Sequence, residues 1–216
     1  MHPDWLSNAY LVADEEGGTA AFIDSGAPLA PLHDAAQQLG VTVTHLLTTH
    51  ADHDHVAGDD ELRSRYGLEI VKGPLETGGL RFEALETPGH KDDHLTFVAN
   101  GEAAFTGDVL FKDAVGGGNF AQIRESVMNV LMKLPPETRV YPGHTDETTI
   151  GREWDQNPFV RVWRGEEPEG TEPVRVGGQP ATLVVWSPDY DGKGKAWVRL
   201  EGGEDAIVGG SRVERG

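Results

Sequence analysis

A cluster of histidine and aspartate side chains limits what this chain can fold into more than any other feature. Residues 50–55 read His-Ala-Asp-His-Asp-His. Imidazoles and carboxylates so close in sequence must share a small volume, and repulsion between the carboxylates is costly unless a cation neutralises them. The apolar and β-branched run 43–48 just before the cluster predicts a strand. The cluster is therefore expected on a loop between a strand and a helix.

Three later turns end in the same kinds of side chain. Their sequences are Thr87-Pro88-Gly89-His90, Thr106-Gly107-Asp108 and Tyr141-Pro142-Gly143-His144. The glycine before each of these ligand-type residues permits a sharp backbone turn that directs the next side chain toward a common centre. One Pro-Gly-His turn is weak evidence, because a single histidine is more often a core or capping residue. The full ordered set predicts a metal site.

Composition narrows the chemistry of that site. The chain has 216 residues and no cysteine, so disulfides and thiolate ligands are excluded and nitrogen and oxygen ligands remain. Such ligands suit zinc, iron or manganese. The 36 acidic residues against 18 basic ones give a net charge of −18, which opposes binding to nucleic acid or to an anionic membrane surface. The sequence shows no long apolar run and no signal-like start, so a cytoplasmic location is expected.

Alternating helical and extended patterns predict an α/β layered domain. Helices are expected at 29–39, 59–66 and 122–134, and strands at 9–12, 20–23, 43–48, 68–71, 80–85, 95–98, 103–105 and 139–141. Composition changes near residue 165, where an acidic stretch rich in Gly and Pro resembles a linker. We therefore expect one domain with the metal site over 1–165, which the resemblance described below implies to be a metal hydrolase, and a small β-rich extension over 166–216.

The extension is predicted to contain short strands at 182–186, 195–200 and 206–208. Its aromatic residues Trp186, Tyr190 and Trp197 are expected to form a small core. Capping of an active-site mouth, contacts in a homodimer or binding of a partner are the alternatives for this segment.

The ordered motifs resemble the metallo-β-lactamase superfamily, and within it the glyoxalase-II-like hydrolases and the persulfide dioxygenases. The signature of that family is a HxHxDH loop followed by a His, an Asp and a His, which match residues 50–55, His90, Asp108 and His144. Asn8 and the segments 105–111, 148–153 and 157–159 add to the resemblance. It covers about residues 8–160 and implies an αββα sandwich, here followed by the small β-rich extension.

The resemblance implies two divalent metal ions, usually zinc and in some members iron or manganese, with a hydroxide between them. One site would comprise His50, Asp52 and His90, and the other Asp54, His55 and His144, with Asp108 bridging both. Asp54 and Asp108 would also position the nucleophile. The ligand residues to be located are His50, Asp52, Asp54, His55, His90, Asp108 and His144.

One position departs from the family signature, because Asp52 stands where the family has its second histidine. A carboxylate there could bind a metal directly, bind through water, or leave the first site weak. His53 is expected to point outward or to support a ligand. Asp24, Asp92, Asp93 and His94 are further candidates for supporting the ligands, since ligating imidazoles usually donate their second nitrogen to an oxygen.

The implied activity is cleavage of an ester-like bond in a small molecule, foremost a thioester, by a hydroxide that bridges the metals. The acidic β-rich extension stands where glyoxalase II members carry basic residues for glutathione, which argues against that substrate. Three alternatives stay open. They are a persulfide dioxygenase with one iron on His50, His90 and Asp108, a lactonase, and a non-catalytic binding module.

Overall fold

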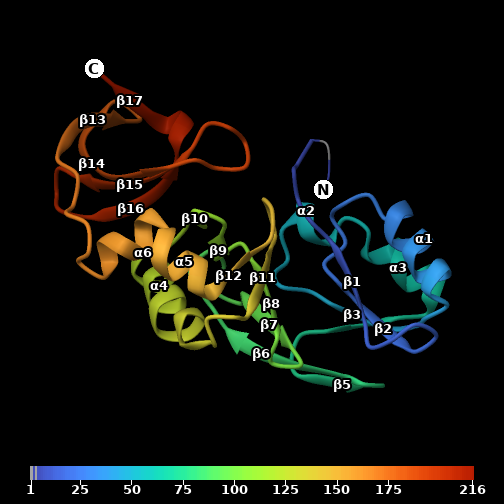
Figure 1. Ribbon diagram of the computed structural model, residues 1–216. Helices are drawn as coiled ribbons and strands as arrows, with labels where there is room; N and C mark the ends of the chain where they lie inside the picture. The colour runs from blue at the N-terminus through green and yellow to red at the C-terminus, as the bar shows by residue number, and fades with distance from the viewer. Residues whose placement is uncertain (1, 3) are drawn as a thin grey trace.

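Two β-sheets packed face to face form the centre of the protein. The computed structural model describes residue 2 and residues 4–216. It shows an αββα sandwich with a further sheet at one end (Figure 1). The first sheet has the order β1 (Tyr10–Ala13), β2 (Thr19–Ile23), β3 (Thr42–Leu47) and β4 (Glu69–Val71). Strand β1 is antiparallel to β2, and the other neighbours are parallel.

Two helices cover the outer face of this first sheet. They are α1 (Ala30–Leu39) and α3 (Asp59–Tyr66), and each is followed by a glycine in the left-handed conformation, Gly40 and Gly67. Left-handed glycines end helices in this way because they have no Cβ to clash. Buried apolar side chains of both helices pack against the strands. The structure thus confirms the helices predicted at 29–39 and 59–66.

The second sheet carries most of the turns that were singled out in the sequence. Its order is β12 (Thr148–Thr149), β11 (Arg139–Pro142), β8 (Ala103–Gly107), β7 (Leu95–Ala99), β6 (Leu80–Glu86) and β5 (Leu75–Thr77). Strands β8 and β11 are parallel, so their carboxyl ends meet at one edge. Phe82, Phe97 and Phe105 from this sheet meet Ile23 and Leu47 from the first sheet. A two-stranded ribbon, β9 (Leu110–Phe111) and β10 (Ala114–Val115), follows β8.

A second helical layer covers the opposite face of the second sheet. It contains α4 (Phe120–Glu125), α5 (Ile150–Gln156) and α6 (Pro158–Trp163). The continuous α-helix predicted at 122–134 is wrong, because α4 gives way to a π-helical turn at Ser126–Val130 and a 3₁₀ turn at Leu131–Lys133. Ile123, Val127 and Leu131 are spaced by four, and all three remain fully buried despite the changes of helical pitch.

The C-terminal part of the chain forms a third, antiparallel sheet. Its order is β16 (Asp205–Gly209), β15 (Lys195–Leu200), β14 (Gln179–Ser187), β13 (Glu172–Val176) and β17 (Val213–Arg215). The sheet lies beside α4 and α6 (Figure 1). Among the described residues, no helix is long and apolar enough to span a membrane.

The aromatic residues of the extension do not form the small core that was expected. Trp197 is only 4% exposed, but it packs into the core built by α4, α5 and α6. Trp186 is 38% exposed. The core on the other face of the sheet consists of aliphatic side chains such as Val174, Leu183 and Val198. The extension is therefore docked through one face on the helical layer of α4, α5 and α6.

Candidate metal centre

The loops that follow β3, β6, β8 and β11 bring the predicted ligands to one place. The cluster at 50–55 lies between β3 and the end of the short helix α2 (His53–Val56). His90 follows β6, Asp108 follows β8 and His144 follows β11. Each of the seven predicted residues belongs to at least one group whose ligand atoms lie within 4.8 Å of one another. These groups are His50–Asp52–His90, His50–His55–Asp108 and Asp54–His55–His144.

Glycines before the ligands have the role that the turns predicted. Gly89 and Gly107 adopt φ values of 135° and 45°, which disfavour residues with a Cβ. Gly143 has a different reason to be glycine: a Cβ there would lie 2.3 Å from Asp108 Oδ1. A side chain at this position would therefore collide with the centre.

Hydrogen bonds fix which ring nitrogen each histidine presents to the centre. Nδ1 of His55 lies 2.8 Å from Asp24 Oδ2, Nδ1 of His90 lies 2.8 Å from the Gly117 carbonyl, and Nδ1 of His144 lies 2.9 Å from the Leu6 carbonyl. Since these partners are acceptors, each Nδ1 carries the proton in the neutral ring and each Nε2 presents a lone pair. This is how metal-binding imidazoles are usually held.

The Nε2 lone pairs face carboxylate oxygens rather than donors. His55 Nε2 is 3.3 Å from Asp108 Oδ1, and His144 Nε2 is 3.3 Å from Asp108 Oδ2 and 3.5 Å from Asp54 Oδ2. His50 Nε2, His55 Nε2 and Asp108 Oδ1 are buried without a hydrogen-bond partner. Buried lone pairs aimed at each other are costly unless a proton or a metal ion lies between them. The donor set therefore fits divalent metal ions.

The pKa values of the centre show the same need for positive charge. Burial lowers the pKa of His50 to about 2. Burial acts in the same direction on His55, yet the carboxylates of Asp108 and Asp24 outweigh it and raise the pKa of that ring to about 11. Asp108 is buried, which opposes ionisation, but His144 and His55 hold its pKa well below the usual range. A carboxylate that stays ionised while buried is suited to bind a cation.

Asp52 takes the position of the missing histidine in the first group. Its Oδ2 lies 3.2 Å from His90 Nε2 and 3.8 Å from His50 Nε2, so the shorter side chain still reaches the centre. Its Oδ1 lies 2.7 Å from Nζ of Lys91, a residue that the sequence reasoning did not single out. The signal that could have found it was a lysine directly after a predicted ligand.

Two of the four predicted supporting residues contact the ligands. Asp24 is 2% exposed and accepts hydrogen bonds from the Thr49 backbone N, the Thr49 hydroxyl and His55 Nδ1, each at 2.8 Å. His94 Nε2 accepts a hydrogen bond of 3.0 Å from the Asp108 backbone N. The remaining candidates, Asp92 and Asp93, are exposed, and Asp93 pairs with Lys72.

The loop that carries His144 is held in an unusual conformation. Thr145 has a φ of 71°, which is strained for a β-branched residue. Asn8 Nδ2 donates to the carbonyls of Pro142 at 3.0 Å and Thr145 at 2.9 Å, and the Tyr10 hydroxyl also donates to Pro142. The strand β1 and the residues before it therefore fix the backbone around the final ligand.

His53, the remaining histidine of the 50–55 cluster, points outward and lies edge-on to Trp5.

An aromatic ring from the extension also reaches the centre. Tyr190 stacks on the ring of His144 with a centroid distance of 4.1 Å and an interplanar angle of 9°. The expectation that Tyr190 belongs to a core of the extension is therefore wrong.

Comparison with known proteins places this centre in a family. Residues 2–78 match the sequence family described as the metallo-beta-lactamase superfamily. A hydroxyacylglutathione hydrolase from Rhodopseudomonas palustris (strain BisA53) is 34% identical over 92% of this chain and 89% of its own length. The chain belongs to the metallo-beta-lactamase superfamily. This membership confirms the predicted family and fold class and makes the protein a metallo-hydrolase of that superfamily.

Two solved structures of the superfamily support the assignment. The crystal structure of ETHE1 from Myxococcus xanthus has a TM-score of 0.64 and 32% identity, and the match covers 73% of this chain and 80% of that one. The structure of TTHA1623 in a di-iron-bound form has a TM-score of 0.62 and 30% identity over 74% of this chain and 97% of that one. The αββα sandwich is thus shared with both.

Proposed function

We propose that this protein hydrolyses thioesters of small molecules at a metal centre built from the seven residues at the strand ends. The observation that carries the proposal is the set of Nε2 lone pairs aimed at carboxylate oxygens around Asp108. His50, Asp52 and His90 would hold one ion, Asp54, His55 and His144 would hold the other, and Asp108 would serve both. Similarity to a protein named hydroxyacylglutathione hydrolase supports a thioester as the bond that is cleaved.

The metal would supply Lewis-acid activation of a water molecule and of the substrate carbonyl. Zinc is our first choice of metal, and the similarity to a protein solved in a di-iron-bound form keeps iron as the alternative.

The residues of the chain itself orient the attack. Asp54 and Asp108 both place an oxygen within 3.5 Å of His144 Nε2, so they flank one point of the centre. A water molecule beside that point can donate a hydrogen bond to either carboxylate, which leaves an oxygen lone pair free to face the substrate carbonyl. The Asp54 side chain is 30% exposed, so the centre is open on this side. Water oxygen then bonds to the carbonyl carbon, the C–S bond breaks, and the thiol leaves with a proton that came from water.

Metal content and turnover, measured on the same preparation, test this proposal. We expect metal in the purified protein, thioester cleavage that stops when a chelator removes the metal, and recovery when zinc is restored. Oxygen uptake on a persulfide by a protein with one iron per chain would favour the dioxygenase instead, and preferred cleavage of a lactone would favour a lactonase. A protein that is free of metal, inactive on all three substrates and fully stable would contradict the proposal.

A further inference from the structure

The loop between β14 and β15 carries Tyr190 to the edge of the metal centre. The Tyr190 ring lies face to face with His144 and edge-on to Phe111, the latter at a centroid distance of 5.9 Å. The Nε2 atom of the same His144 ring points to Asp108. A residue from the extension thus contacts the face of a ring that belongs to the centre.

This loop is held firmly in place. Asp189 and Lys195 form an ion pair of 3.0 Å with side chains that are only 3% and 11% exposed. The Ser187 hydroxyl donates to the Asp113 carbonyl and so ties the start of the loop to the turn between β9 and β10. The Lys195 ammonium also lies 5.7 Å from the centre of the Tyr190 ring. These buried contacts give the ring a defined position instead of leaving it on a free surface loop.

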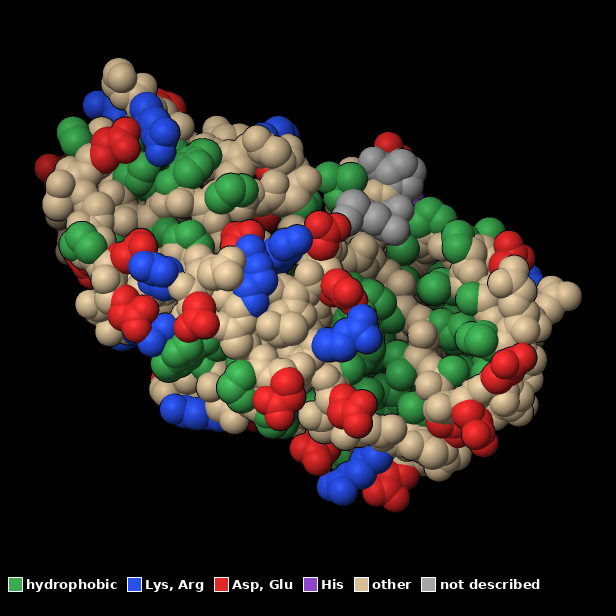
Figure 2. All heavy atoms as spheres, viewed as in Figure 1, with side chains coloured by type: hydrophobic (Ala, Val, Ile, Leu, Met, Phe, Trp, Pro, Cys, Tyr) green, Lys and Arg blue, Asp and Glu red, His purple; other side chains and the backbone are tan. Residues whose placement is uncertain are grey.

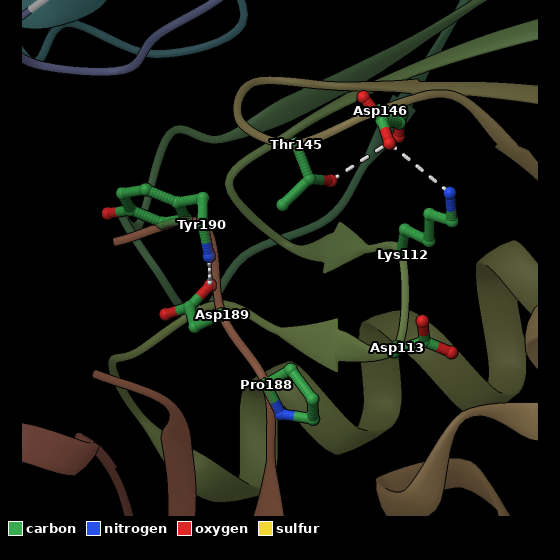
Figure 3. A pocket seen from close by; sticks show the side chains of 7 residues that line it. All are labelled: Lys112, Asp113, Thr145, Asp146, Pro188, Asp189 and Tyr190. Atoms are coloured by element: carbon green, nitrogen blue, oxygen red, sulfur yellow. Dashed lines mark hydrogen bonds and ion pairs between the residues drawn. The ribbon is translucent and has the colours of Figure 1, made fainter. Parts of the chain in front are cut away.

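A cavity of about 320 Å³ opens beside the Tyr190 ring. Three short segments line it, residues 112–113, 145–146 and 188–190 (Figure 3). The segment 145–146 directly follows His144, and the Tyr190 ring stacks on His144, so two parts of the cavity wall lie next to a candidate ligand. Its volume is at the small end of ligand pockets. The cavity therefore has room for one modest group of a substrate whose reacting bond lies at the metals.

The charges around the cavity are already paired. Asp113, Asp146 and Asp189 line it, and Lys112 is the only cation among its described lining residues. The Lys112 ammonium pairs with Asp146 at 3.3 Å, and Arg152 and Lys195 from behind pair with Asp113 and Asp189. No lining cation is left to receive a carboxylate or phosphate of a ligand. The net excess of acidic side chains over the whole chain, part of which Figure 2 shows, also repels anions.

We propose that Tyr190 is a specificity-determining residue that walls a pocket for the neutral thiol part of the substrate. This inference rests on the proposed thioesterase activity and adds the leaving group to it. A neutral group can pack against the phenol ring, while an anionic thiol such as glutathione finds no unpaired cation among the described lining residues. The extension thereby selects the substrate, although the metal ligands all come from the αββα sandwich.

The test compares thioesters of one acyl group with neutral N-acetylcysteamine and with anionic glutathione. We expect the wild-type protein to have the higher kcat/KM on the neutral thioester. Tyr190→Ala should raise KM for that thioester about three- to tenfold, the range expected for loss of an aromatic contact. Its kcat, its metal content and its KM for the glutathione thioester should change much less. Tyr190→Phe, which keeps the ring, should recover the lower KM.

Lys193→Ala is the matched control, because it removes an exposed side chain from the same loop and should leave both KM values unaltered. A wild-type preference for the glutathione thioester, or an unaltered KM in Tyr190→Ala, would overturn the inference. If neither thioester is hydrolysed, the proposed function fails. The pocket is then tested separately by calorimetry, which measures binding of the amide analogue of the neutral thioester. Weaker binding to Tyr190→Ala than to Lys193→Ala would support it, and equal binding would refute it.

Discussion

Asp24 offers the sharpest test of how the centre is organised, because it touches a ligand without being one. Its buried carboxylate accepts three hydrogen bonds, two from Thr49 and one from His55 Nδ1. In Asp24→Asn, the side chain keeps its size but has only one carbonyl oxygen. If that oxygen serves the Thr49 backbone N, the amide NH₂ group faces His55 Nδ1. Two donors then oppose each other, and His55 must move its proton to Nε2 or give up the bond.

The size of the effect follows from this conflict. A proton on Nε2 blocks the atom that faces Asp108, so metal binding must first reverse the tautomer. Loss of such a supporting partner typically weakens metal affinity by about 10- to 100-fold, or about 1.4–2.8 kcal/mol. Backbone strain would not account for a loss of metal affinity in Asp24→Asn, because residue 24 has a φ of 55°, a conformation that Asn adopts readily. The expected defect therefore belongs to the side-chain contacts alone.

Competition with a chromophoric chelator measures the affinity directly, and Asp93→Asn is the matched control. Asp93 is a carboxylate that pairs with Lys72 on the surface, so its amide should bind metal as the wild type does. Equal metal affinity in Asp24→Asn and Asp93→Asn would refute the reasoning. So would an equal loss in both variants, because the effect would then come from overall charge and not from His55.

Four further substitutions test other parts of the structure. His55→Ala and Asp108→Ala should each abolish thioester hydrolysis while circular dichroism still reports a folded protein. Lys91→Met should raise the affinity of the first ligand group by up to about fivefold, because an exposed ion pair is worth about 1 kcal/mol or less; metal titration with Lys72→Met as control measures this. Trp197→Ala should lower the free energy of unfolding in urea by about 3–5 kcal/mol, whereas Trp186→Ala, at a partly exposed position, should lower it less.

Features that depend on local sequence could be predicted well. The helices predicted at 29–39 and 59–66 end at those residues, each before a glycine with positive φ, and Gly89 and Gly107 have the positive φ values that the turns require. The proximity of the seven candidate ligands could be predicted for a related reason. A set of imidazoles and carboxylates placed at successive strand ends has few uses other than holding a cation, so its members could be grouped before their distances were known.

Features that depend on contacts distant in sequence could not be predicted. Tyr190 is 46 residues from His144, and no periodic pattern in the extension indicates that its loop turns back to the centre. The apolar residues at helical spacing in 122–134 include Val127 and Leu131, which are buried in the core, but the sequence does not reveal the π-helical turn at Ser126–Val130. Very short strands such as β10 and β12 have too few residues to show a period.

Asp52 and Lys91 carry opposite charges that compensate each other at the first ligand group. A histidine at position 52 would be neutral, so the aspartate adds one negative charge, and the Lys91 ammonium at 2.7 Å returns one positive charge. Changing either residue alone should therefore alter the charge that a metal ion meets, and changing both should restore it. In a double-mutant cycle, Asp52→Asn and Lys91→Met should shift metal affinity in opposite directions, with a coupling energy clearly different from zero. Additive effects would show that Lys91 merely lies on the surface beside an independent ligand.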